Sequence, residues 1–250
     1  MAEALKSPRR PRRAGRQPRS RQSVLGKAGD SGLAALGRAS RQTLQAQVYD
    51  RLKSAVMTGV LAPGQPVSIR GLASALGTSP IPVREALRHL AAERAVEVQP
   101  NGSVAVPEMT RARFEDLRRT RLVIEGFATE LAAASMTPAT IRRVEGLFAQ
   151  VDALHRSGDV KKFLAQNQRM RFVIYQAIDS PTLMPIIESL WLQVGPFFNL
   201  SMAEPHLRRS LSYDLAAINA LKRGDGPEAR KWIERDISET GDYILSLLKG

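Results

Sequence analysis

Apolar residues recur every three or four positions through most of this chain, the spacing that places them on one face of an α-helix. The first such stretch begins at Thr43 and stops at Gly59. The segment Leu61-Ala62-Pro63-Gly64-Gln65-Pro66 follows, and its prolines and glycine cannot continue a helix. The pattern therefore predicts a first helix that is closed by a tight turn.

Two shorter helices are predicted next, over about residues 68–76 and 79–94, with a glycine between them. Ser68 is a suitable N-cap for the first, and Gly77 is a suitable residue just past its end. Ser79 caps the second, and Pro80 lies in its first turn, where the N–H that proline lacks has no helical partner. This arrangement is typical of a helix-turn-helix whose second helix opens with polar and basic residues.

A β-hairpin is predicted after these helices. Val96–Val98 and Val104–Val106 flank the segment Pro100-Asn101-Gly102-Ser103, and an Asn-Gly pair favours a tight hairpin turn. A helix, a helix-turn-helix and a hairpin in this order predict a winged helix-turn-helix domain over residues 43–107, which binds double-stranded DNA.

The remainder of the chain, residues 108–250, shows helical periodicity alone. The predicted helices are Thr110–Met136, Pro138–Ser157, Asp159–Asp179, Thr182–Leu200, His206–Arg223 and Pro227–Lys249. We therefore expect a mostly α protein, in which the winged helix-turn-helix precedes an antiparallel all-α bundle of about six helices. The interior of such a bundle is where a small ligand binds, and the same domain is expected to mediate dimerisation.

Charge is distributed unevenly. The chain carries a formal net charge of +13, and residues 1–42 alone hold eleven lysines and arginines against two acidic residues. This segment is rich in Arg, Pro, Ser and Gly and lacks a hydrophobic period, so we expect a disordered basic tail. It either adds nonspecific affinity for DNA phosphates or is a solvated extension without that role.

Composition excludes several classes of protein. The chain has no cysteine, which excludes disulfides, thiolate zinc sites and a cysteine nucleophile, and which fits a reducing compartment. Its apolar runs are shorter than the ~20 residues that span a bilayer, and its start lacks the apolar core of a signal peptide. We expect a cytoplasmic bacterial protein, associated with the nucleoid and not with a membrane.

The second helix of the helix-turn-helix carries the candidate DNA-reading residues. Arg84 and Arg88 are four residues apart and share a face, and Arg84 lies near the end that enters the major groove. An arginine there holds guanine O6 and N7 with two hydrogen bonds. Arg88 has the alternative of a solvated residue paired with a nearby acid.

Other residues are expected to contact the DNA backbone. Arg70 reaches a phosphate or a base, and Ser79 lies at a helix N-terminus, which is suited to a phosphate. Asn101 and Gly102, at the tip of the hairpin, reach the backbone or the minor groove.

These residues resemble a known family. The pattern Arg70-x-Leu72-Ala73 through Gly77-x-Ser79-Pro80-x-Pro82-Val83-Arg84-Glu85-Ala86-Leu87 is similar to the DNA-binding domain of the GntR family of bacterial transcription regulators. The resemblance implies DNA contacts from Arg70, Ser79, Pro80 and Arg84. Many members carry Arg or another polar residue where this chain has Pro80, so Pro80 is expected to contribute shape instead of a hydrogen bond.

The helical half resembles the FadR-type C-terminal effector domain, FCD, of the same family. Arg121-x-x-x-Glu125, Ser180-Pro181 and Ala220-Leu221…Asp225 carry this resemblance. Many such domains bind a divalent metal through Asp-x-x-x-His on one helix and one His on each of the last two helices.

This chain departs from that metal-binding pattern. The corresponding positions hold Asn167, Arg171, Asp214 and Asp236. The three histidines of the chain, His89, His155 and His206, lie elsewhere and are expected to be surface or locally bonded residues.

The changed residues favour a pocket without the usual metal. A guanidinium has no lone pair to give, so Arg171 is not a ligand and is expected to be attracted to Asp214 and Asp236 as a substitute positive charge. Arg121, or a cationic or hydroxyl-rich effector, then offsets the remaining negative charge. Three alternatives stay open: Arg171 binds a ligand carboxylate, a hard cation is held by the oxygens of Asn167, Asp214 and Asp236, or these residues lie on outer helix faces.

The sequence thus predicts a ligand-responsive transcription regulator, a repressor that binds a palindromic operator as a homodimer. The effector expected for the pocket of Arg121, Asn167, Arg171, Asp214 and Asp236 is a carboxylate or sugar acid, with no cofactor. An enzyme with an acid–base pair at Asp214 and Asp236 is disfavoured, because the sequence has no nucleophile–base motif, phosphate loop or cofactor fingerprint. An architectural DNA-binding protein without an effector is the remaining alternative.

Overall fold

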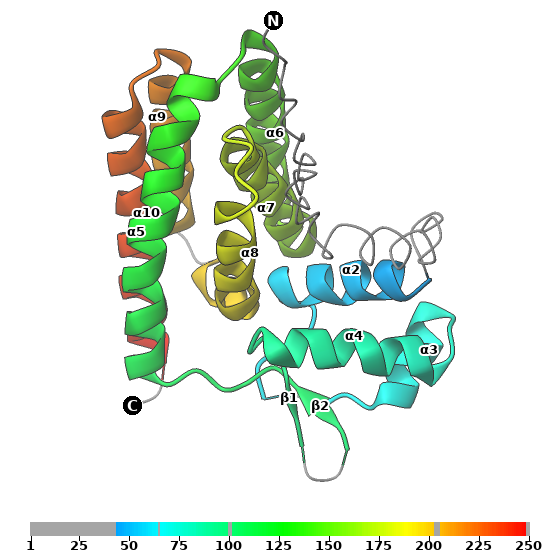
Figure 1. The fold of residues 1–250 in the computed structure, drawn as a ribbon. Helices are drawn as coiled ribbons and strands as arrows, with labels where there is room; N and C mark the ends of the chain where they lie inside the picture. Colours follow the sequence, from blue (N-terminus) through cyan, green and yellow to red (C-terminus); the bar gives the residue numbers. More distant parts are fainter. Residues whose placement is uncertain (1–43, 65, 100–101, 203–205, 249–250) are drawn as a thin grey trace, which may run out of the picture. The chain divides into compact units, whose positions relative to one another are not determined.

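The computed structural model describes residues 44–64, 66–99, 102–202 and 206–248, and these ranges hold helices and one small sheet (Figure 1). The predicted basic tail, residues 1–42, lies outside the described residues, as does Asn101. The prediction of a mostly α protein with a winged helix-turn-helix and a helical bundle is confirmed. Within the described ranges, each helix is too short or too polar to cross a membrane.

The helix-turn-helix consists of α3 (Ile69–Leu76) and α4 (Pro80–Ala92), and α4 packs against both α3 and α2 (Leu44–Met57). Ser68 caps α3 by accepting a hydrogen bond of 3.0 Å from the backbone N–H of Gly71. Gly77 ends α3 in the left-handed conformation, at φ 64°, which a residue without a Cβ adopts at little cost. The two caps of α3 that the sequence predicted, Ser68 and Gly77, therefore fix the turn that sets the direction of α4.

The wing is an antiparallel pair of short strands, β1 (Glu97–Val98) and β2 (Val104–Ala105). Val98 is paired with Val104, and the turn includes Gly102 at φ 77°. Val67, just before α3, exchanges two backbone hydrogen bonds with Val104, which attaches the wing to the helix-turn-helix.

In the described part of the second half of the chain there are six α-helices. They are α5 (Arg111–Ser135), α6 (Pro138–Ser157), α7 (Val160–Gln176), α8 (Leu183–Val194), α9 (His206–Lys222) and α10 (Gly226–Leu247). Helix α10 packs along α5 and α9, and α6 packs along α7 (Figure 1). Side-chain caps at Thr110, Thr137, Asp159 and Asp225 begin four of the helices.

One predicted helix is wrong in its extent. The sequence predicted a continuous helix over Thr182–Leu200, but α8 ends at Val194 and a 3-10 helix, η1 (Gly195–Ser201), replaces its last turns. Pro196 has no N–H for an α-helical hydrogen bond, which disfavours continuation of α8.

Gly195 and η1 also contact α2. A Cβ at position 195 would lie 2.6 Å from the Cα of Met57, so only glycine fits this close backbone approach. Asn199 of η1 donates a hydrogen bond of 3.0 Å to the carbonyl oxygen of Gly59, and Lys53 of α2 pairs with Glu188 of α8 at 2.6 Å. The helix-turn-helix core and the bundle are therefore joined through η1 and α8.

Candidate DNA interface and ligand pocket

The start of α4 presents an exposed basic residue, as a recognition helix requires. Arg84 is exposed and has no ion pair with any residue that the structure describes, and the same holds for Arg70 on α3. Arg88 is also exposed, but its Nη1 lies 2.7 Å from Oε1 of Glu85. Arg84 is therefore the arginine of α4 whose donors are available to a base edge. In the free protein, Arg88 instead matches its predicted alternative of a solvated residue paired with a nearby acid.

The N-terminus of α4 offers further contacts. Ser79 is exposed and makes no side-chain hydrogen bond to the helix, so its hydroxyl is available to a phosphate, while Pro80 beside it has no N–H to donate. Ile81, in the first turn of α4, is 70 % exposed. Sequence reasoning missed Ile81, and an apolar side chain at this position suits contact with a thymine methyl group.

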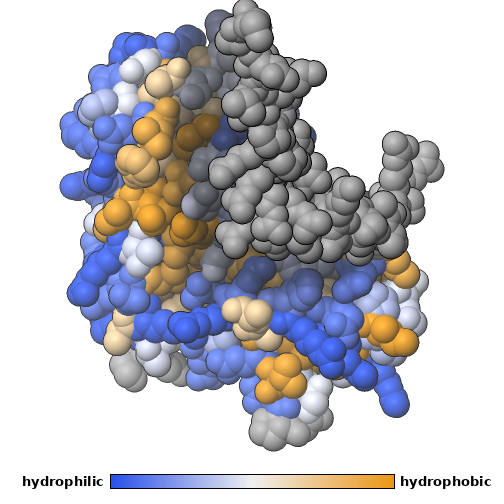
Figure 2. All heavy atoms as spheres, in the orientation of Figure 1, coloured by the Kyte–Doolittle hydropathy of each residue, from blue (hydrophilic) through white to orange (hydrophobic). Residues whose placement is uncertain are grey.

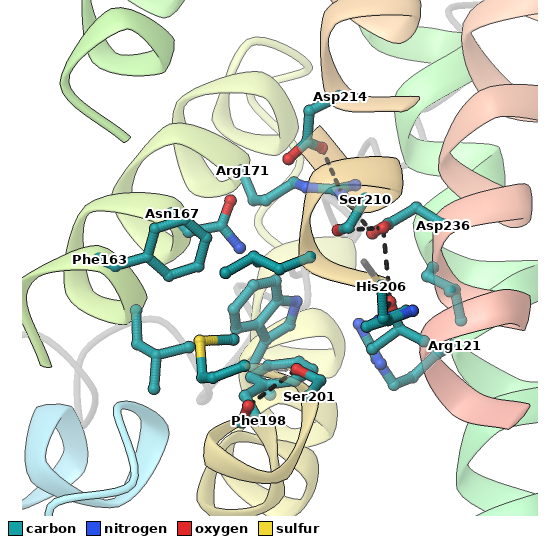
Figure 3. A pocket seen from close by; sticks show the side chains of 16 residues that line it. Arg121, Phe163, Asn167, Arg171, Phe198, Ser201, His206, Ser210, Asp214 and Asp236 are labelled. Atoms are coloured by element: carbon teal, nitrogen blue, oxygen red, sulfur yellow. Dashed lines mark hydrogen bonds and ion pairs between the residues drawn. The ribbon is translucent and has the colours of Figure 1, made fainter. Parts of the chain in front are cut away.

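A polar pocket lies among the helices of the bundle (Figure 3). All five residues predicted for it, Arg121, Asn167, Arg171, Asp214 and Asp236, line this one cavity. The free volume is about 40 Å³, well below the roughly 300 Å³ or more typical of small-molecule sites. Side chains thus fill most of the pocket, and a ligand larger than a few atoms must displace some of them.

Arg171 joins three helices at the centre of the pocket. Its Nη2 lies 2.5 Å from Oδ1 of Asp214 on α9 and 2.5 Å from Oδ2 of Asp236 on α10 (Figure 3). All three residues are buried. Burial alone lowers the pKa of Arg171, but the two carboxylates outweigh that effect and leave the pKa above its ordinary value. The predicted attraction between Arg171 and the two aspartates is present in the structure.

The two aspartates differ in their remaining partners. Asp236 accepts a hydrogen bond of 2.5 Å from Ser210 and a long one of 3.5 Å from Thr240. Oδ1 of Asp214 is close to Arg171 but outside hydrogen-bond geometry, and it has no hydrogen-bond partner within the described residues. Loss of hydration raises the pKa of Asp214 to about 7, with Arg171 opposing the rise and Asp236 adding to it. A proton on Asp214 leaves Arg171 balanced by one carboxylate charge.

A second buried ion pair forms the wall next to this triad. Glu125 of α5 is fully buried, and its Oε1 lies 2.6 Å from Nε of Arg121. Its Oε2 accepts hydrogen bonds from the hydroxyl of Tyr175 at 2.7 Å and from the indole N–H of Trp191 at 3.0 Å. The guanidinium of Arg121 also lies over the rings of Trp191 and Phe198, at 5.8 and 5.3 Å from their centroids.

Arg121 and Asn167 retain groups for a ligand. The hydrogen bonds of Arg121 to Glu125 use Nε and Nη2, which, among the residues that the structure describes, leaves the donors of Nη1 for a further acceptor. Oδ1 of Asn167 is buried without a hydrogen-bond partner within the described residues. The pocket therefore combines a cationic donor with an unpaired acceptor, next to the aromatic rings of Trp191 and Phe198.

Several pocket residues escaped sequence reasoning. His206 is not a surface residue: it is buried, stacks on Tyr243 at 4.8 Å, and lies 3.3 Å from the hydroxyl of Thr240. Burial lowers its pKa and favours the neutral imidazole. Helical spacing was an available signal, because His206 and Ser210 precede Asp214 by eight and four residues, and Thr240 follows Asp236 by four. Trp191 and Phe198 had no such signal.

The fold and these two sites define a DNA-binding protein with a ligand-binding helical domain. Residues 44–106 match the bacterial regulatory proteins of the GntR family, and residues 116–239 match the FCD domain. This chain belongs to the GntR family of bacterial transcription regulators and carries an FCD effector domain.

Individual relatives agree with this assignment. The HTH-type transcriptional regulator McbR of Escherichia coli (strain K12) is 32 % identical over 160 residues, which is 64 % of this chain and 72 % of McbR. A probable D-xylose utilization operon transcriptional repressor of Paenarthrobacter nicotinovorans is 27 % identical over 188 residues, 75 % of this chain and 83 % of that protein. The solved structure of E. coli McbR/YncC superposes with a TM-score of 0.77 at 28 % identity and covers 82 % of this chain and 98 % of its own. These relatives are transcription regulators, which confirms the prediction that this chain is a regulator and not an enzyme.

Neutralising Glu125 is expected to destabilise the fold strongly. Glu125→Gln leaves the buried guanidinium of Arg121 without its countercharge, which costs about 3–5 kcal/mol. The matched control is Glu130→Gln on the same helix, whose partner Arg230 is partly exposed, and it is expected to cost about 1 kcal/mol or less. Urea unfolding curves of the two variants measure both values. Equal losses of unfolding free energy would contradict the structural role of Glu125.

Proposed function

We propose that this protein is a ligand-responsive repressor that binds a palindromic operator as a homodimer. The observation that carries the proposal is the presence in one chain of an exposed Arg84 on α4, without an ion pair to any described residue, and a buried polar pocket in the bundle. Repressors are also named among its relatives, including a gluconate operon transcriptional repressor of Bacillus subtilis (strain 168), 23 % identical over 163 residues.

The effector proposed for the pocket is a small hydroxylated carboxylate, such as a sugar acid. Nη1 of Arg121 suits a carboxylate oxygen, and Oδ1 of Asn167 suits a ligand hydroxyl. The rings of Trp191 and Phe198 suit the C–H face of a sugar carbon chain. The xylose and gluconate operons in the names of two relatives are consistent with this chemical class.

A route from the pocket to the DNA-binding half runs through η1. Because the cavity is only about 40 Å³, a sugar acid must displace lining groups, and η1 supplies two of them, Phe198 and Ser201. The same segment packs on Met57 through Gly195 and holds Gly59 through Asn199. Displacement of η1 therefore perturbs the end of α2, and couplings of this kind are typically worth ~1–3 kcal/mol.

The proposed dimer contact is the outward face of α5. Between residues 120 and 134, the exposed positions of this helix are all uncharged: Thr120, Val123, Phe127, Leu131 and Ala134. Figure 2 shows this apolar surface gathered over the middle of α5 among hydrophilic surroundings. The opposite face of the same segment is buried in the bundle, so the outward apolar residues take no part in the bundle core and are suited to contact with another chain.

A second copy of the chain is the occupant proposed for this face. A palindromic site presents the same half-site twice, and it is matched by two α4 helices related by a two-fold axis. An α5–α5 contact is self-complementary under that axis. It also lies on the helix that directly follows the wing, so the contact sets the distance between the two DNA-reading helices.

Arg84→Ala is expected to weaken operator binding about 10- to 100-fold and to relax base preference, since a bidentate guanine contact is worth ~1–3 kcal/mol. Arg88→Ala is the matched control on the same helix, with a smaller effect, because Arg88 is paired with Glu85. Fluorescence anisotropy on a selected operator and on a random duplex at fixed salt measures both. If Arg84→Ala leaves the ratio of the two affinities unchanged, the assignment of Arg84 as the base reader is wrong.

Phe127→Glu is expected to convert the dimer to a monomer in sedimentation velocity and to lower operator affinity, because it places charge in the centre of the α5 face. Val160→Glu is the control, since Val160 is an exposed apolar residue outside that face. A Phe127→Glu variant that stays dimeric would rule out this contact.

A thermal-shift screen of sugar acids and small hydroxycarboxylates tests the effector. A true effector raises the apparent melting temperature and changes operator affinity. Asn167→Ala is expected to weaken that ligand about tenfold through a lost hydrogen bond, without loss of stability, because Oδ1 of Asn167 has no partner within the described residues. A panel without a single stabilising compound that alters DNA binding would contradict the proposed effector class.

A further inference from the structure

The FCD resemblance implies a divalent metal in this pocket, and the residues present do not fit one. Of the four positions that would supply ligands, one is Arg171, whose guanidinium has no lone pair to donate and carries its own positive charge. Within the described residues, no group of three or more His, Asp or Glu side chains is arranged to hold a metal ion. The residues at these four positions therefore do not fit a divalent metal, because of the chemistry of their side chains.

The carboxylates that remain are already engaged. Oδ2 of Asp236 and Oδ1 of Asp214 each lie 2.5 Å from the same nitrogen of Arg171, and Oδ1 of Asp236 accepts from Ser210. A dication that bound these oxygens would have to separate both ion pairs and leave a buried guanidinium without a countercharge. Breaking a buried pair in this way is strongly unfavourable.

Arg171 is also held in place by its surroundings. It is 3 % exposed and comes from the middle of α7, four residues after Asn167 on the same face of the helix. Its guanidinium points from α7 toward α9 and α10, between the two aspartates (Figure 3). The positive charge at the centre of the pocket is therefore part of the polypeptide and is present whatever the metal content of the cell.

We propose that Arg171 is the permanent cation of this pocket, in the place of a bound divalent metal, and that the pocket recognises its ligand without a metal. The inference rests on the proposed function only in taking this cavity as the effector site. Ligand contacts then come from Arg121, Asn167 and the hydroxyl groups of the lining, while the Arg171 triad remains a fixed polar wall.

The wild-type protein tests this directly. Elemental analysis after expression in medium supplemented with zinc, manganese and nickel salts is expected to find no stoichiometric metal. The chain has two tryptophans, so Trp232→Phe leaves Trp191 in the pocket wall as the one tryptophan, which is excited selectively at wavelengths that tyrosine does not absorb. Its emission and the melting temperature are expected to stay constant through titrations with ZnCl₂, MnCl₂ and NiCl₂. Stoichiometric metal, or a saturable change in Trp191 emission, would overturn the proposal.

The second part of the test is a variant designed to gain affinity for a divalent metal. Asn167→Asp combined with Arg171→His places a carboxylate and an imidazole four residues apart on α7, facing Asp214 and Asp236, which is a donor set that divalent metals accept. This double variant is expected to bind Zn²⁺ or Mn²⁺ and to rise in melting temperature on metal addition, even if its metal-free form is unstable. Arg171→Lys is the control, because it keeps a cation and is expected to gain no metal affinity.

The outcomes separate this inference from the proposed function. If the double variant gains no metal affinity, the charge at position 171 is not what excludes the metal, and the proposal fails. None of these measurements uses an effector or DNA, so a failed effector screen would remove the proposed function and leave the metal result standing.

Discussion

Charges buried inside this bundle have to be paired, and that requirement determines how its helices meet. Arg171 on α7 is matched by Asp214 on α9 and Asp236 on α10, so these three helices converge on one guanidinium. Glu125 on α5 is matched by Arg121 and by donors from α7 and α8. An unpaired charge at either place would cost several kcal/mol, a large fraction of the roughly 5–15 kcal/mol that stabilises a typical protein. The pocket lies between this triad and the Arg121–Glu125 pair.

The pocket is connected to the DNA-binding half of the chain by packed segments. With a free volume of about 40 Å³, the cavity cannot hold a molecule as large as a sugar acid unless lining side chains move. Segment η1 contributes to that lining and also contacts α2 through Gly195 and Asn199. Helix α2 in turn packs against α4, the helix that carries Arg84. A change in the pocket thus has a continuous packed path to the recognition helix.

The helix-turn-helix was predictable because local chemistry determines it. Ser68, Gly77 and Pro80 mark helix ends through capping, a left-handed turn and a missing N–H, and each acts within a few residues of sequence. The split of the predicted helix at Val194 was missed, although Gly195-Pro196 was a visible signal. The close approach of Gly195 to Met57 was not predictable, because it joins residues far apart in the chain.

The pocket was predictable only in part. Asn167, Arg171, Asp214 and Asp236 were placed by resemblance, and the structure brings them together. Their helical neighbours His206, Ser210 and Thr240 share the same faces, so spacing alone was sufficient to find them. Trp191, Phe198 and the partners of Glu125 depend on tertiary packing that no local pattern encodes. The role of Arg84 remains a prediction, consistent with its exposed position on α4.

The central claim is that a guanidinium, and not a metal, supplies the positive charge of the pocket. The most direct test is a crystal structure from crystals soaked in a zinc or manganese salt, with anomalous data collected at the absorption edge of that metal. The account predicts no anomalous peak between Asp214 and Asp236, and electron density for Arg171 that bridges the two carboxylates. A peak at that position, with Arg171 turned away from the aspartates, would contradict it.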